Sequence, residues 1–317
     1  MALDHYVPQV YLKQFNSPAL GNAQMYAFSK KDLKIFPAHT RSVCRKEDGN
    51  TNKYLKEPRM VEDYLKKFEP KYPTVLQNIE NKNINDEDIF TIAGLIACIL
   101  ACSPTKMRCQ ITPLEELVKE VIRLVERKGM IPELPSDLPG KSLFELIEKD
   151  VVKCEIDPKF SQALGIGSIE SIINMLKNCK WEILLNRSYS SEFYTSDFPI
   201  AIEPIKGFLG MNRIFPLSPS VAVRICITDE SFHLFNDFSS PKFHYQIKEL
   251  GYKDIVKINK LTIQCAEAYI FFRNKFQGIE TFLTKNASYN LIDDTQILNT
   301  HNGKYIEVKT KINKKAP

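Results

Sequence analysis

The spacing of apolar residues divides the chain into a long helical middle and two flanking parts that read as strands. Near the start, Tyr11, Leu12 and Phe15 lie three and four residues apart, which predicts a short amphipathic helix. Two strand-like runs follow at 24–28 and 33–36, and the polar residues between them predict a hairpin.

Between residues 58 and 180 the apolar period is helical. The expected helices are 60–80, interrupted at Pro70 and Pro73, then 86–102, 113–128, 141–152 and 169–179. The longest apolar run, IFTIAGLIACILAC at 89–102, is shorter than the roughly 20 residues that cross a bilayer. We therefore expect a buried helix, no membrane span, and a helical subdomain over 58–180.

After residue 180 the period shortens to that of strands. The expected strands are 181–185, 193–195, 200–202, 213–217 and 221–227, followed by a helix over 254–272 and a closing strand over 305–312. This order predicts an α+β fold, in which the N-terminal hairpin and the C-terminal strands build one mixed or antiparallel sheet. The helical subdomain is then an insertion within one composite domain that spans residues 1–317.

Composition excludes several classes of protein. With 317 residues, 44% of them hydrophobic, and ordinary counts of 12 Gly and 18 Pro, the chain is neither disordered nor collagen-like. The net charge is +5, but the segment 304–317 carries five lysines against one glutamate, which leaves 38 basic and 37 acidic residues elsewhere. A broad cationic face for nucleic acid is thus not indicated. We interpret 304–317 as a solvated basic tail that could add weak, salt-sensitive contacts.

The eight cysteines indicate buried thiols rather than disulfides. They have no CxxC spacing, and the opening MALDHYVPQVYL has neither the basic nor the apolar region of a secretory leader, so we expect a cytoplasmic location. Cys98, Cys102 and Cys109 would share a helical face only if the helix continued through Pro104, and we interpret them as core residues rather than zinc ligands. Motifs of nucleotide cofactors, GxGxxG or GxxxxGK, do not occur.

His5 is the most informative of the five histidines because it comes just before the predicted helix that starts at Pro8. Unpaired N–H groups at a helix start favour an anion such as phosphate, and they would keep the imidazole neutral, as a general base requires. Tyr6, Gln9 and Lys13 are then candidate substrate-binding residues. The alternative is structural: His5 caps the helix or braces the start of the chain.

Ser196 and Asp197 are the second candidate pair, and they precede a Phe-Pro dipeptide. Short polar side chains in such a place fix a turn by bonding to the backbone. The functional alternative puts Asp197 beside His5, where it orients the imidazole or binds a divalent cation, with Ser196 as donor or nucleophile. A nucleophile elbow would need glycines at Tyr194 and Phe198, which disfavours serine-hydrolase chemistry.

Other acidic residues are weak metal candidates. Asp197, Glu203 and Lys206 follow the order seen in metal-dependent nucleases, but the spacing of the last two would point them to opposite faces of a strand. Glu62 and Glu69 share a helical face two turns apart, about 10 Å, which is too far to chelate one ion unaided. A solvated helix face is the alternative for this pair.

Four segments together resemble an uncharacterised microbial family, the domain of unknown function 4238. They are HYVPQVYLKQF at 5–15, TSDFPI at 195–200, FPLSP at 215–219, and Asn259 followed by Ala266 in NKLTIQCAEAYIF. VEDYLKKFEP at 61–70 is similar to the family's acidic helix. Where the resemblance implies Arg-Thr-Pro, this chain has Cys-Ser-Pro at 102–104, and Arg108 is the nearest residue that could substitute. The resemblance adds Asn259 to the candidate substrate-binding residues and implies no activity.

Two hypotheses of different class follow. In the first, the chain is a nuclease-like hydrolase of a phosphate-containing substrate such as a nucleic acid: His5 is the base, Gln9 holds phosphate, and Asp197 orients His5 or binds a cation such as Mg²⁺. In the second, the chain is a non-catalytic ligand-sensing or protein-binding module, in a defence or stress system. The first requires that His5 and Asp197 meet in the folded chain. The sequence indicates neither the substrate nor the oligomeric state.

Overall fold

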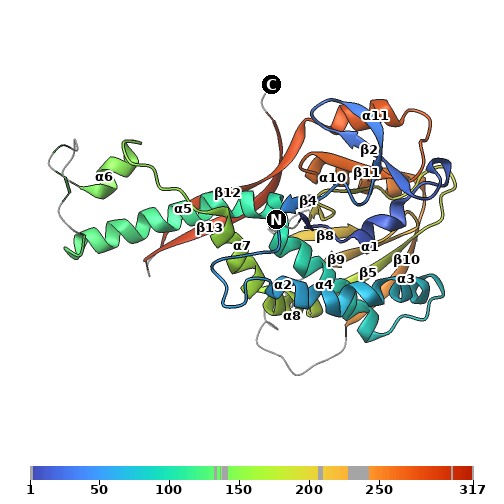
Figure 1. The fold of residues 1–317 in the computed structure, drawn as a ribbon, viewed down its shortest axis with the longest axis horizontal. Helices are drawn as coiled ribbons and strands as arrows, with labels where there is room; N and C mark the ends of the chain where they lie inside the picture. Colours follow the sequence, from blue (N-terminus) through green and yellow to red (C-terminus); the bar gives the residue numbers. More distant parts are fainter. Residues whose placement is uncertain are drawn as a thin grey trace.

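The computed structural model describes residues 3–131, 134–135, 137, 142–205, 210–227, 243–300 and 303–315. Two sheets and a layer of helices make up its body, and an arm of helix α5 and a β-hairpin project from it (Figure 1). This arrangement confirms the predicted α+β class.

The larger sheet has the strand order β10-β5-β9-β8-β7. Its strands are β5 (Lys180–Asn186), β7 (Ala201–Pro204), β8 (Met211–Pro216), β9 (Val221–Cys226) and β10 (His244–Leu250). β10 pairs with β5 in parallel and the other pairs are antiparallel, so the sheet is mixed.

The smaller sheet joins the two ends of the chain. Its order is β3-β2-β11-β6, with every pair antiparallel. The strands are β2 (Gln24–Ser29), β3 (Lys34–His39), β6 (Thr195–Ser196) and β11 (Tyr269–Phe272). The predicted N-terminal hairpin, β2–β3, therefore lies in one sheet with the C-terminal strands β6 and β11. The expectation of a single sheet is wrong, because most of the predicted C-terminal strands form the larger sheet and the closing strand belongs to a separate two-stranded sheet.

Two further ladders stand apart from these sheets. β1 (Leu3–His5) pairs with β4 (Arg45–Glu47), which places His5 opposite Arg45. β12 (Tyr289–Thr300) pairs with β13 (Gly303–Lys314) along its whole length. Most of the lysine-rich segment at 304–317 is thus a strand rather than a free end, while its last two residues lie outside the described part of the chain.

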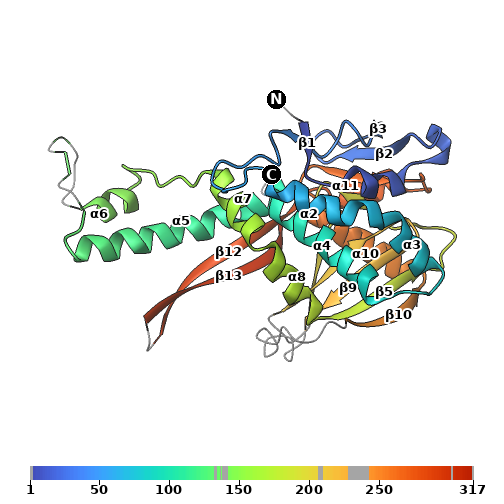
Figure 2. The ribbon, with the colours of Figure 1, turned by 60° about the horizontal axis from the view of Figure 1, so that its bottom comes forward.

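The helical layer follows the predicted order. Its helices are α2 (Met60–Phe68), α3 (Tyr72–Glu80), α4 (Asp86–Cys102), α5 (Pro104–Arg127), α6 (Leu143–Glu148), α7 (Pro158–Gly167) and α8 (Ile169–Lys177). α4 is buried on nearly all sides between α2, α7 and α8 (Figure 2). Its start is fixed by a capping box, in which Asn85 and Asp88 each accept from the other's backbone N–H.

α5 begins nine residues earlier than predicted. Ser103 caps it by accepting from the Lys106 N–H, and Pro104 takes the first helical position, where it loses no hydrogen bond. Pro113, predicted to start the helix, lies inside it. α4 and α5 meet at 59°, so Cys102 and Cys109 do not continue one straight helical face. Within the described residues no single helix is long and apolar enough to cross a membrane, and only this bent pair taken together passes such a test.

The predicted helix at 254–272 is wrong in its second half. α10 (Tyr252–Cys265) ends before it, and Tyr269–Phe272 form strand β11. α7, β10, β12 and a short helix α11 (Ile279–Asn286) were not predicted. One hydrophobic core extends from the N-terminal Val7 through Ile96 of α4 to Trp181 and Phe215 of the large sheet. A smaller cluster fills the space between the small sheet, α10 and α11.

Candidate functional site

His5 lies at the end of β1 with both ring nitrogens engaged. Nε2 is 3.2 Å from the Thr40 carbonyl oxygen, and Nδ1 is 3.5 Å from Nε2 of Gln9. Because a carbonyl only accepts, Nε2 carries the proton and Nδ1 faces the Gln9 amide. Burial lowers the pKa of the imidazole, and the charge of Arg45 across the ladder lowers it further. These effects favour the neutral form of the ring.

Asp197 is buried and its carboxylate bonds to backbone. Oδ1 accepts from the Glu267 N–H at 3.0 Å, and Oδ2 accepts from the N–H groups of Ala268 and Tyr269 at 2.7 and 3.0 Å. Burial raises the pKa of this carboxyl to about 6, while the three N–H donors act in the opposite direction. In the described structure Asp197 and His5 thus have separate partners, and no hydrogen bond joins them.

Ser196 follows the turn-forming alternative. Its buried hydroxyl donates to the Phe198 carbonyl at 2.6 Å and lies 3.2 Å from the Phe198 N–H. These bonds occupy the Oγ that a nucleophile would need free. The residue stabilises the bend that brings Asp197 towards the end of α10.

Two buried tyrosines join the N-terminal half of the chain to these motifs. The hydroxyl of Tyr11, in helix α1 (Gln9–Leu12), donates to the Pro216 carbonyl at 2.7 Å and also bonds to Oγ1 of Thr195. The Tyr72 hydroxyl donates to the Leu217 carbonyl at 2.7 Å. The segments that carried the family resemblance therefore meet in the interior, through hydrogen bonds between their own polar groups.

The candidate substrate-binding residues are scattered. Tyr6 is half-buried beside Cys44 and Asp197, and burial raises the pKa of its phenol. Lys13 is exposed at the end of α1. Asn259 on α10 accepts from the Tyr194 N–H at 2.9 Å and donates to the Glu192 carbonyl at 2.7 Å, so it anchors the segment before β6.

A buried cation that no sequence pattern indicates lies beside Asp197. The ammonium of Lys30 donates to the carbonyls of Ile263, Ala266 and Tyr289 at 3.0, 2.7 and 2.6 Å. Burial lowers the pKa of Lys30 to about 8. Lys30 follows a hairpin strand, and nothing in the sequence near it indicates that it is buried. Its partners are backbone carbonyls more than 200 residues away.

Arg108, noted as the nearest substitute for a family arginine, reaches the same turn. Its Nε and Nη2 donate to the two carboxylate oxygens of Glu267 at 2.9 and 2.7 Å, and Nη2 also donates to the Leu291 carbonyl. This bidentate pair fastens α5 to the turn that Asp197 holds.

Glu62 and Glu203, two of the acidic residues considered for metal binding, have other partners. Glu62 accepts from Asn50 at 2.5 Å and pairs with Arg59, while burial raises the pKa of Glu69. No group of three His, Cys, Asp or Glu in the described chain is arranged to hold a metal ion. Glu203 forms ion pairs with Arg224 and Lys257, and Lys206 lies outside the described residues.

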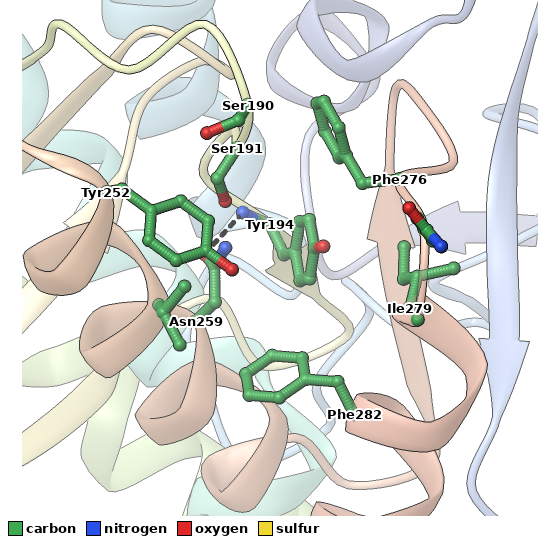
Figure 3. A pocket seen from close by; sticks show the side chains of 11 residues that line it. Ser190, Ser191, Tyr194, Tyr252, Asn259, Phe276, Ile279 and Phe282 are labelled. Atoms are coloured by element: carbon green, nitrogen blue, oxygen red, sulfur yellow. Dashed lines mark hydrogen bonds between the residues drawn. The ribbon is translucent and has the colours of Figure 1, made fainter.

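A cavity of about 460 Å³ opens between α10, α11 and the segment before β6 (Figure 3). Its lining comprises Ser190, Ser191, Tyr194, Tyr252, Val256, Asn259, Phe276, Gln277, Gly278, Ile279 and Phe282. Four rings face it, and the Tyr194 ring is held in place against Phe272 at 5.5 Å. None of these described lining residues carries a charge, and Asn259 joins the cavity to the motif core.

Comparison with protein families gives one match. The model of the family described as "Protein of unknown function (DUF4238)" matches residues 4–276. Searches of curated proteins and of solved structures found no match to the chain.

Proposed function

The chain belongs to the DUF4238 family of proteins of unknown function, and we propose that it is a ligand-binding module whose cavity between α10 and α11 takes an uncharged, planar small molecule. The observation that supports this most is the combination of four aromatic rings with an uncharged lining. The cavity volume of about 460 Å³ falls within the range of roughly 300–1,000 Å³ that is typical of small-molecule sites.

The lining favours a flat and partly apolar ligand. The rings of Tyr194, Tyr252, Phe276 and Phe282 surround the cavity, with the hydroxyls of Ser190 and Ser191 near its edge (Figure 3). Aromatic faces stack on planar rings, while the hydroxyls supply hydrogen bonds that fix orientation. A phosphate or carboxylate would lose its water there without gaining a cation, which is costly. The proposed ligand is therefore a neutral aromatic or heteroaromatic compound.

Binding without turnover is the function that this lining supports. It offers hydroxyl, amide and aromatic groups, but no imidazole, carboxylate, amine or thiol among the described residues. The motif residues Ser196 and Asp197, which a catalytic site would draw on, are bonded to backbone in the interior. In this proposal the motif residues have a structural role. Asn259 helps to shape the cavity by bonding to the segment before β6.

The test is binding of a panel of neutral heteroaromatic fragments, for example indole, adenine and uracil, measured by ligand-observed NMR and thermal shift. Phe282→Ala removes one ring and is expected to weaken binding about tenfold, which corresponds to about 1.4 kcal/mol. Val256→Trp fills the space and is expected to abolish binding. Tyr189→Ala, at a fully exposed neighbouring ring outside the lining, is the matched control and should leave binding unchanged.

Equal binding by the wild type, Phe282→Ala and Val256→Trp would contradict the assignment to this cavity. The absence of any response to a panel of neutral rings, alongside a response to phosphate compounds, would contradict the ligand class.

A hydrolase acting on a phosphate-containing substrate is the second candidate, and one observation favours it. Arg41, Arg45 and Lys46 are exposed in the segment that faces His5, and Arg45 lies directly across the β1–β4 ladder from it. These cations and the Gln9 amide could hold a phosphate beside a neutral imidazole.

The second candidate is tested by cleavage of labelled RNA and DNA with and without Mg²⁺. His5→Ala should remove the activity, and His39→Ala, at an exposed histidine on β3, is the matched control that should retain it. Equal cleavage by both variants, or no cleavage by the wild type under either condition, would contradict a hydrolase that uses His5.

A further inference from the structure

The outer half of α5 carries an apolar stripe that the described structure leaves about half exposed. The outer part of the helix projects from the body of the molecule (Figures 1 and 2). Leu117, Val121 and Leu124 are 48%, 48% and 52% exposed, and their spacing of four and three residues puts them on one face. A continuous apolar stripe of this kind on a projecting helix indicates an interaction surface.

Charges beside the stripe are ordered along the helix. Glu116 lies near its inner end and Arg127 near its outer end, and eleven residues, about three turns, place both on the same flank. When two copies of a helix pair antiparallel, each flank meets the same flank of the other copy. Pairing centred on Val121 therefore sets Leu117 against Leu124 and Glu116 against Arg127, twice by symmetry. Parallel pairing would instead set each flank against the opposite flank of the other copy, so the match between Glu116 and Arg127 would be lost.

We propose that a second copy of this chain binds along Leu117, Val121 and Leu124 of α5, antiparallel, to form a two-fold symmetric dimer. Both the apolar and the charged positions fit the same register, as an interface between identical surfaces requires. Glu116 also pairs with Lys119 within the helix at 2.8 Å, but such a surface pair contributes little and yields readily to an interface contact. The proposal is independent of the cavity, because the cavity lining contains no residue of α5.

The oligomeric state is measured by analytical ultracentrifugation over a range of concentrations. We expect a reversible dimer for the wild type and at least tenfold weaker dimerisation for Leu124→Glu, because the change buries a charge against Leu117. Leu164→Glu is the matched control: this leucine is 45% exposed on α7, away from the stripe, and its change should not affect dimerisation. Circular dichroism verifies that the variants are folded. A wild type that stays monomeric at every concentration overturns the proposal.

A charge exchange tests the register. Glu116→Arg and Arg127→Glu each create like-charge contacts in the dimer and are each expected to weaken it about tenfold. The double variant restores opposite charges across the interface and should dimerise within about threefold of the wild type. Additive weakening in the double variant would overturn the antiparallel register.

Disulfide trapping tests orientation directly. On a background with Cys154 and Cys226 changed to serine, since these are the thiols that are not fully buried, a Leu117→Cys chain is mixed with a Leu124→Cys chain. Antiparallel pairing predicts that a Leu117→Cys chain forms a disulfide rapidly with a Leu124→Cys chain. Two copies of the same variant should form a disulfide slowly. The reverse preference would indicate a parallel pair and overturn the proposal.

Discussion

Single polar residues decide where the chain changes direction. Asp197 captures three N–H groups at the point where α10 ends and β11 begins, and Lys30 captures the carbonyls of Ile263 and Ala266 from the other side. A carboxylate that accepts from free N–H groups and an ammonium that donates to free carbonyls together satisfy a buried turn. These hydrogen bonds give the Ser-Asp motif a structural role.

Asp197→Ala should destabilise the protein by about 3–5 kcal/mol. The change leaves three part-buried N–H groups without their carboxylate partner, and each costs about 1–3 kcal/mol, with less than full additivity. Urea denaturation measures the loss. Asp63→Ala is the matched control, since its carboxylate is 72% exposed and its pair with Lys66 contributes less than about 1 kcal/mol. Similar stability of the two variants would refute the structural role of Asp197.

His5 makes stability depend on pH in a direction that follows from its environment. Burial, with Arg45 adding to it, holds the pKa of the folded imidazole below its ordinary value of 6.5. The unfolded chain therefore binds the proton more tightly, and the stability contributed by neutral His5 is complete above pH 6.5 and is lost as the pH falls towards the folded pKa. Urea denaturation between pH 7.5 and 5 should show a steeper loss for the wild type than for His5→Gln. Parallel curves for the two proteins would show that this histidine does not contribute.

At the scale of elements, sequence predicts best where the signals are local. The start and end of α4 were predicted at Asp86 and Cys102 because acidic residues precede a long apolar run. The helix predicted over 254–272 continues in its apolar period, yet the structure ends it at Cys265, because its turn is made by Asp197 from 70 residues away. The sequence pattern within a helix cannot show a hydrogen-bond partner that lies so far away in the chain.

Pro113 explains why the predicted start of α5 is nine residues too late, and it also gives a testable prediction. A proline in the middle of a helix lacks the N–H that would bond to the carbonyl four residues earlier, so it was interpreted as a start signal. Pro113→Ala should restore that bond and stabilise α5 locally by about 1–3 kcal/mol, which corresponds to roughly 10–100-fold slower amide exchange in this helix. Thr112→Ala, at the exposed neighbouring position, is the control and should change exchange less than about fivefold. Unchanged exchange in Pro113→Ala would show that the proline costs α5 nothing.

At the scale of the whole molecule, the cavity could not be predicted from the sequence. Its lining comes from three segments, 190–194, 252–259 and 276–282, and their aromatic residues follow no shared period. The family resemblance made Asn259 a candidate substrate-binding residue, and Asn259 does line the cavity. Its hydrogen bonds join the segment 252–259 to the segment 190–194. The cavity exists only because these three segments of the C-terminal half fold together, whereas the sequence patterns direct attention to the motifs, which lie in the core.

The helical layer and the sheets share one core, which predicts one unfolding transition. The indole of Trp181 on β5 donates to the Leu176 carbonyl of α8 at 2.9 Å, and Tyr72 of α3 bonds to Leu217 beside β8. Trp181 is the single tryptophan and is fully buried, so its fluorescence reports on the sheet while circular dichroism at 222 nm reports mainly on the helices. Because neither layer can open without exposing the apolar face of the other, urea curves from the two probes should coincide.

Tyr72→Phe leaves a buried carbonyl without its donor. The variant should lower the urea midpoints of both probes together, which corresponds to a loss of about 1–3 kcal/mol in stability. Helical signal lost at a lower urea concentration than the fluorescence change would show instead that residues 58–180 unfold as a separate unit.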